Sequence, residues 1–100
     1  MTESTAYTQR QATNYGWIAE SFLKLVGNTP LVPLRQIAPD CPHEIWAKLE
    51  FLNPTGSIKD RMALYIVEEA ERSGEIKRGD LLIDNSSGNT AVAVGMVGAC

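Results

Sequence analysis

The chain opens with polar residues and then passes into short blocks in which hydrophobic residues recur at regular spacing. Residues 1–16 are rich in Thr, Gln, Ser and Asn and show no apolar period, which predicts a flexible leader. Order is expected to begin near Trp17 with a short helix or turn. A short strand is predicted over residues 31–34, and Pro33 suits the edge of a sheet. Residues 45–52 alternate between apolar and polar side chains well enough to predict a second strand.

The second half of the chain predicts two helices separated by another strand. The first helix is expected over residues 58–73, with Ser57 at its N-terminal cap and Gly74 at its end. A short strand over residues 81–84 follows. Residues 90–100 are almost all small or apolar, which predicts a buried helix that packs closely on a sheet. Helical spacing predicts that the apolar face of the first helix consists of Ile58, Met62, Tyr65, Ile66 and Ala70.

The order of these elements, strand, helix, strand, helix, is typical of an α/β protein with a parallel sheet. Parallel strands need cover on both faces, and too few elements are present to provide it. The last predicted helix also has no closing turn. We therefore expect residues 17–100 to form an incomplete α/β domain.

Composition and charge exclude several classes of protein. The 100 residues, 44% of them hydrophobic, fit one small domain, and the net charge of −3 argues against a nucleic-acid partner. No apolar run reaches the roughly 18 residues of a membrane-spanning helix, and Met1–Asn14 lack the pattern of a signal peptide, so we expect a cytoplasmic chain without a membrane partner. Cys41 and Cys100 match no disulfide framework or metal site, and the single histidine, His43, excludes a His-rich metal centre.

Two loops, residues 53–61 and 86–90, carry the residue types that could perform chemistry. Each follows a predicted strand and opens a predicted helix, where free backbone N–H groups and the positive helix end favour anions. In a parallel sheet both loops would lie at the carboxyl ends of strands, where ligands usually bind. The sequence therefore predicts two adjacent anion-binding loops at one edge.

Lys59 is predicted in the first turn of the helix that the first loop opens. The helix dipole, together with burial, would disfavour an ammonium there and lower the pKa of the lysine below its reference value of about 10.4. A neutral amine could form a Schiff base. On local features alone, a solvated surface lysine beside Asp60 is the more common alternative.

The second loop concentrates hydroxyl, amide and backbone N–H groups at a helix start: Ser86, Ser87, Gly88, Asn89 and Thr90. This set suits a carboxylate or a phosphate. A simple N-cap and turn is an equal alternative, because Ser, Asn and Thr are favoured there for local reasons. No lysine follows the glycine, so the loop is not a nucleotide-binding P-loop.

Four blocks of the sequence carry a resemblance when they are taken together. They read L-V-G-N-T-P-L-V at 25–32, A-K-L-E at 47–50, N-P-T-G-S-I-K-D-R at 53–61 and S-S-G-N-T at 86–90. In this order they resemble the cysteine synthase and cystathionine β-synthase family of pyridoxal-phosphate enzymes, which have the tryptophan-synthase-β fold type. The resemblance covers roughly residues 22–100. It implies a three-layer, parallel-sheet α/β domain with pyridoxal 5′-phosphate as the cofactor. Residues 17–100 would be the N-terminal portion of that domain, which is incomplete in this chain.

The resemblance also implies a role for each loop residue. Lys59 matches the lysine that binds pyridoxal 5′-phosphate covalently and serves as the catalytic base. Asn89 matches the asparagine that hydrogen-bonds the ring oxygen of the cofactor. The α-carboxylate of the substrate would be bound by Ser86, Ser87, Gly88 and Thr90. Family members usually carry Thr where this chain has Ser86, so the hydroxyl is kept, and Gly where it has Ala91.

The function that the resemblance implies is β-replacement on a serine-type amino acid, as in L-cysteine biosynthesis. The substrate would be a small amino acid, and a homodimer is common in the family. The family's phosphate cup lies beyond the residues matched here, so this short chain is expected to be inactive or partly active. The alternative hypothesis is a truncated, non-catalytic remnant that acts as a weak ligand-binding or subunit-binding module, since the apolar residues 90–100 would invite a partner.

Overall fold

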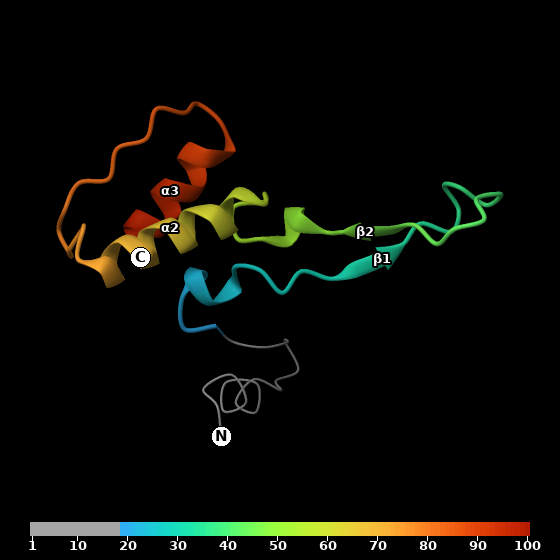
Figure 1. Cartoon of the computed structure of the whole chain (residues 1–100), viewed down its shortest axis with the longest axis horizontal. Coiled ribbons are helices and arrows are strands. Elements are labelled where there is room, and N and C mark those ends of the chain that lie inside the picture. The colour runs from blue at the N-terminus through green and yellow to red at the C-terminus, as the bar shows by residue number, and fades with distance from the viewer. Residues whose placement is uncertain (1–18) are drawn as a thin grey trace, which may run out of the picture.

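The computed structural model describes residues 19–100, so the flexible leader predicted over residues 1–16 lies outside the described residues. A long hairpin arm projects from a pair of packed helices (Figure 1). In chain order the elements are η1 (Phe22–Leu25), β1 (Leu31–Pro33), β2 (Trp46–Lys48), η2 (Glu50–Leu52), α2 (Lys59–Ser73) and α3 (Asn89–Ala99).

The hairpin arm consists of β1 and β2, which pair antiparallel with Val32 opposite Ala47. Backbone hydrogen bonds extend the ladder at both ends, from Leu34 N–H to the Ile45 carbonyl (2.8 Å) and from Leu49 N–H to the Pro30 carbonyl (3.0 Å). The parallel sheet was predicted from strands that alternate with helices. The one sheet among the described residues is this antiparallel pair, whose strands are joined by a loop without a helix.

The core lies between α2 and α3, where Ala63 meets Ala93 and Val97. The face of α2 that packs on α3 continues along Leu64 and Val67. The predicted apolar face was therefore wrong, since Ile58, Met62, Tyr65 and Ile66 are exposed. Residues 62–67 are all apolar, so the helical period alone does not single out the face that contacts α3.

The C-terminal end of α2 follows local chemistry that the sequence predicts, but its start does not. The Ser57 hydroxyl accepts a hydrogen bond from the Lys59 N–H at 3.2 Å. The N-cap residue is nevertheless Ile58, without a side-chain cap bond, so the predicted Ser57 cap was wrong and the helix begins one residue later than expected. At the other end Gly74 adopts a left-handed φ of 82°, and its N–H donates to the Ala70 and Glu71 carbonyls. The predicted C-terminal cap is confirmed.

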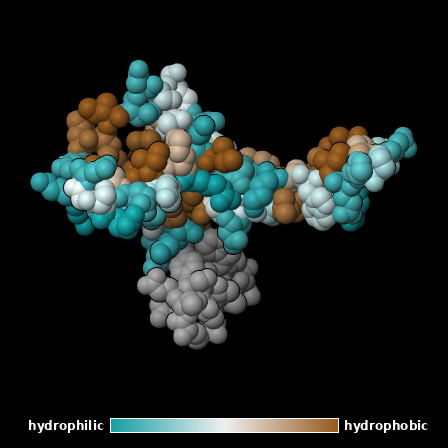
Figure 2. Space-filling model, in the orientation of Figure 1, coloured by the Kyte–Doolittle hydropathy of each residue, from teal (hydrophilic) through white to brown (hydrophobic). Residues whose placement is uncertain are grey.

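Residues 81–84 and helix α3 both differ from the prediction because neither takes part in a sheet among the described residues. Within the described chain, residues 81–84 form no strand, because no other segment pairs with their backbone. Leu81 and Ile83 are 82% and 84% exposed, and hydrophobic side chains gather on that side of the molecule (Figure 2). Helix α3 packs on α2 and not on a sheet, so only Ala93 and Val97 of it are buried.

Candidate functional site

Lys59 is the first residue of α2, and its side chain is exposed. Among the described residues no hydrogen bond or ion pair engages its amine. The burial expected for this lysine does not occur in the described chain. The next two residues, Asp60 and Arg61, behave differently, because both turn inward and are held by named partners.

Asp60 closes the loop that precedes Lys59. Its side chain is fully buried and accepts hydrogen bonds from the Thr55 N–H at 2.7 Å and from the Thr55 hydroxyl. A buried carboxylate requires such donors, because desolvation without them is costly. Gly56, with a left-handed φ of 90°, lets the chain turn between these two residues.

Arg61 belongs to a polar cluster, which we call the Glu50 cluster, formed by Thr29, Glu50, Asn53 and Arg61. One carboxylate oxygen of Glu50, Oε2, accepts from Arg61 Nε and from Asn53 Nδ2, both at 2.8 Å. The other, Oε1, accepts from the Thr29 hydroxyl at 2.6 Å and from Arg61 Nη2 at 3.1 Å. Hydrogen bonds from Arg61 and then Thr29 lower the pKa of Glu50 to about 2, against an opposing contribution from burial.

Gly27 brings the first sequence block onto the same cluster. Its N–H donates to Asn53 Oδ1 at 2.8 Å, and its φ is +81°. A Cβ at this position would lie 2.9 Å from Arg61 Nη1. The glycine therefore allows both the turn and the close approach of the guanidinium.

The sequence analysis noted Thr29, Glu50 and Asn53 only as members of the four blocks. It did not predict that they hydrogen-bond to one another. Three of the four blocks meet in the Glu50 cluster, across 32 residues between Thr29 and Arg61. The available signal was a pair of opposite charges, Glu50 and Arg61, on either side of the first loop.

The second loop is exposed from Ser86 to Asn89, and Thr90 is half-buried. The Ser86 hydroxyl accepts from the Gly88 N–H at 3.2 Å, which shapes the turn. No side chain caps the first turn of α3, which follows Gly88. The simple N-cap alternative is therefore not what the structure has, and the N–H groups of that turn are free of a side-chain acceptor.

The two loops lie at the same end of the helix pair. Helices α2 and α3 pack on each other, and in Figure 1 both begin at the end nearer the hairpin arm. Lys59 and residues 86–90 thus come to one side of the molecule. An exposed primary amine can add to an aldehyde, and uncapped helix N–H groups and the Asn89 amide can bind oxygens.

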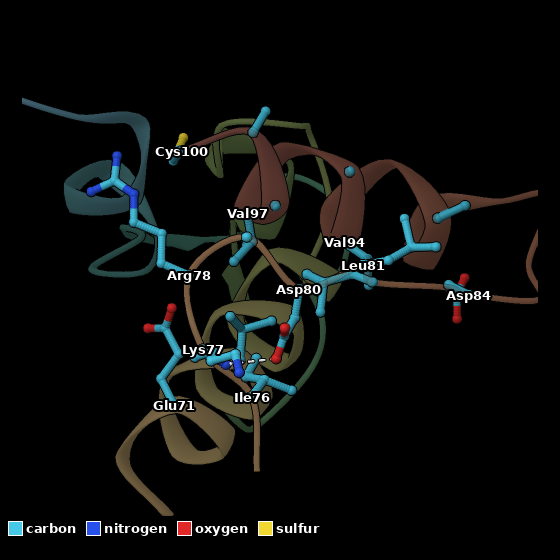
Figure 3. Close-up of a pocket in the computed structure, with 17 residues that line it drawn as sticks. Glu71, Ile76, Lys77, Arg78, Asp80, Leu81, Asp84, Val94, Val97 and Cys100 are labelled. Atoms are coloured by element: carbon cyan, nitrogen blue, oxygen red, sulfur yellow. Dashed lines mark hydrogen bonds between the residues drawn. The ribbon is translucent and has the colours of Figure 1, made fainter. Parts of the chain in front are cut away.

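A hollow in the described part of the chain lies elsewhere. It has a volume of about 800 Å³ between α2, α3 and the segment that joins them (Figure 3). A turn at its rim is closed by the Lys77 N–H, which donates to Asp80 Oδ2 at 2.9 Å. None of the six predicted site residues lines this hollow, so the candidate chemistry belongs to the open surface of the two loops.

Two other features are absent from residues 19–100. No group of histidine, cysteine, aspartate and glutamate side chains there could hold a metal ion. No helix in that range is long and apolar enough to cross a membrane.

Comparison with known proteins identifies the family. The family model described as "Pyridoxal-phosphate dependent enzyme" matches residues 22–100. The chain belongs to this family. The resemblance seen in the four blocks and the pyridoxal-phosphate cofactor of the family are thereby confirmed, and the free amine and uncapped N–H groups of the two loops fit that group.

The relatives of this pyridoxal-phosphate family member include several cysteine synthases. Cysteine synthase B of Salmonella typhimurium (strain LT2) is 57% identical over 74 residues, 74% of this chain and 24% of the relative. Cysteine synthase of Aquifex aeolicus (strain VF5) is 55% identical over 83 residues, 80% of this chain and 25% of the relative. The chain thus spans about a quarter of the length of these relatives.

Solved structures confirm the α/β fold class. An O-ureido-L-serine synthase superimposes with a TM-score of 0.76 at 41% identity, over 82% of this chain and 26% of that one. A cysteine synthase from Entamoeba histolytica gives a TM-score of 0.76 at 35% identity, over 88% of this chain and 27% of that one. The described residues therefore follow the fold of the corresponding part of these enzymes.

Proposed function

We propose that this chain supplies the cofactor-binding lysine and the carboxylate-binding loop for β-replacement on a serine-type amino acid, as in L-cysteine synthesis. The observation that carries the proposal is the division within K-D-R: Asp60 and Arg61 are held by partners, whereas Lys59 is exposed. It opens α2 at the end of the helix pair where the uncapped α3 also begins (Figure 1). The names of the relatives, which are cysteine synthases, support the reaction class.

The residues of this chain would divide the work as follows. Lys59 Nζ would bind pyridoxal 5′-phosphate covalently and, once released, take the proton from the substrate α-carbon. Asn89 would donate a hydrogen bond to the ring oxygen of the cofactor. The α-carboxylate would be bound by Ser86, Ser87, Gly88 and Thr90, which orients the Cα–H bond toward Lys59. When bound, the cofactor supplies a ring that withdraws negative charge from the α-carbon.

The wider setting of the activity belongs to the same proposal. The donor would be a small serine-type amino acid whose β-substituent leaves, and the acceptor a nucleophile such as sulfide. A cytoplasmic location and a homodimer are expected for a protein in amino-acid biosynthesis of this type. The aligned part of the chain covers only about a quarter of each relative, so a complete site would include groups beyond those described here.

An absorbance titration with pyridoxal 5′-phosphate tests the proposal. The chain should develop a visible absorbance band that is absent in Lys59→Ala and unchanged in Lys77→Ala. Lys77 is the matched control, because it is also exposed but lies beyond the C-terminal end of α2. A serine-type amino acid should shift this band. Equal bands in the chain and in Lys59→Ala would contradict the role of Lys59.

A titration without any lysine-dependent band would favour the alternative of a non-catalytic binding module. The exposed side chains of Leu81 and Ile83 are the observation that supports this alternative. It is then expected that the chain binds a protein subunit without the cofactor.

A further inference from the structure

Both carboxylate oxygens of Glu50 are fully engaged in hydrogen bonds from other residues. Each of its two oxygens accepts two hydrogen bonds, and three residues provide the four donors: Thr29, Asn53 and Arg61. The side chain of Glu50 is only 17% exposed, and that of Arg61 is 38% exposed. Charge-assisted hydrogen bonds with this paired geometry are among the strongest in proteins.

The cluster acts on the segment that carries Lys59. Arg61 lies two residues after Lys59, and Asn53 lies at the start of the same loop, so the Glu50 carboxylate holds both ends of residues 53–61. Inside this span, Asp60 fastens the loop to Thr55. Thr29 anchors the whole cluster to the turn before the hairpin arm.

The remainder of α2 is held independently of Glu50. Ala63 packs on Ala93 and Val97, and the C-terminal end is closed by Gly74. The helix as a whole therefore has its own supports, whereas its first turn depends on the cluster.

We propose that Glu50 is a positioning residue for Lys59: by gripping Arg61 and Asn53 it fixes the first turn of α2 and so the place of the Lys59 amine. The proposal rests on the proposed function for the role of Lys59. Glu50 itself is not assigned a contact with substrate or cofactor. Its effect is carried through Arg61 to the backbone of the lysine, which makes it distinct from the residues of the two loops.

Glu50→Gln is the direct test, because it keeps the size of the side chain and removes its charge. It also replaces one acceptor oxygen with an NH₂ group, which cannot accept the two hydrogen bonds that this oxygen receives. Amide hydrogen exchange of the purified chain should rise by about tenfold or more over residues 55–61, since charge-assisted bonds of this strength are lost. Exchange over residues 64–73 should stay close to that of the unchanged chain. Glu69→Gln, which removes the exposed pair with Arg72 on the same helix, is the matched control and should alter neither segment.

A second measurement reads the position of the amine itself. The chain is treated with pyridoxal 5′-phosphate, reduced with borohydride, and the labelled lysines are quantified by mass spectrometry. The ratio of labelling at Lys59 to labelling at Lys77 should fall about tenfold or more in Glu50→Gln and remain constant in Glu69→Gln. If Glu50 only stabilised the fold, Glu50→Gln would raise hydrogen exchange along all of α2 and α3. The ratio of Lys59 to Lys77 labelling would then stay the same in the molecules that remain folded.

The outcomes separate this proposal from the proposed function. If the unchanged chain shows no preference for Lys59 in labelling, the proposed function fails, and hydrogen exchange still decides whether Glu50 positions residues 55–61. A folded Glu50→Gln chain with unchanged exchange there overturns the positioning role. If Glu50→Gln does not fold, Arg61→Lys, which keeps the charge and loses the Nε–H, takes its place under the same criteria. Loss of folding in both variants also overturns it, because the cluster would then hold the whole fold.

Discussion

At the scale of single residues, three adjacent side chains in K-D-R have three different surroundings. Lys59 is exposed, Asp60 is fully buried, and Arg61 spreads over a carboxylate that lies 11 residues earlier. Asp60 and Arg61 each form hydrogen bonds with buried or half-buried groups. Replacing either residue should therefore lower the stability of the fold, whatever its effect on catalysis. The predictions at this scale follow from those partners.

Asp60→Ala should lower the free energy of unfolding by about 1–3 kcal/mol, because the Thr55 N–H loses its acceptor inside the protein. Urea denaturation followed by circular dichroism measures the change. Asp80→Ala is the matched control, since Asp80 accepts a comparable backbone hydrogen bond from Lys77 in an exposed turn. A loss in Asp60→Ala no greater than that in Asp80→Ala would contradict the assigned role.

Gly27→Ala should lower the free energy of unfolding by about 1–3 kcal/mol, because it combines a left-handed φ with a Cβ that meets Arg61 Nη1. Gly79→Ala separates the two causes. Gly79 has a φ of +96° but nothing within 4 Å of the added Cβ, so only the backbone strain of about 1 kcal/mol applies. Equal losses in the two variants would show that the contact with Arg61 is unimportant.

The pH dependence of stability should report on Glu50. Its pKa in the folded chain is about 2, below the ordinary value of 4.5, so folding favours the ionised carboxylate. The contribution of Glu50 is therefore complete above about pH 4.5 and is lost as the pH falls from there toward about 2. Urea denaturation from pH 6 to pH 2 should show the difference between the chain and Glu50→Gln shrinking over this window. A difference that stays constant with pH would refute the assignment.

At the scale of elements, α2 and α3 are stabilised in different ways. No side chain caps the start of either helix, but α2 ends at a left-handed glycine, Gly74. Helix α3 also contains Gly95 and Gly98, which lower helix propensity. Its stability therefore depends on Ala93 and Val97 against α2 more than on its own sequence.

Gly95→Ala should raise the free energy of unfolding by about 0.5–1 kcal/mol, because the added methyl group meets nothing within 4 Å and the helix gains propensity. Gly98→Ala is the comparison. Its Cβ would lie 3.4 Å from Leu82 Cδ1, and it sits in the last turn, so its gain should be smaller. Thermal unfolding of the two variants shows which one is stabilised more. A larger stabilisation by Gly98→Ala would contradict the prediction.

At the scale of the whole molecule, the chain is extended. Its radius of gyration is 17.2 Å, compared with about 13 Å for a compact domain of 100 residues. The projecting hairpin arm accounts for much of this difference (Figure 1). Large hydrophobic side chains are exposed on both parts (Figure 2). They include Ile37 in the loop that joins β1 to β2, and Leu81 and Ile83 in the segment between α2 and α3.

Several features were predictable because they depend on neighbours in the chain. The end of α2 at Gly74 follows from capping, and the two loops were located from their small polar residues. The face of α2 was not predictable in this way, because Met62 and Ile66 satisfy the helical period as well as Ala63 and Val67 do. Contact with α3 selected the second pair.

By itself, the sequence determined the family, the cofactor of that family, and the loops in which Lys59 and residues 86–90 lie, because short motifs and helix ends are local chemistry. Only the tertiary structure decided that Glu50, Asn53 and Thr29 converge on Arg61. It also decided that residues 81–84 remain unpaired and that both candidate loops come to one end of the helix pair. Such contacts join segments up to 32 residues apart, and they form only once packing has fixed the direction of each element.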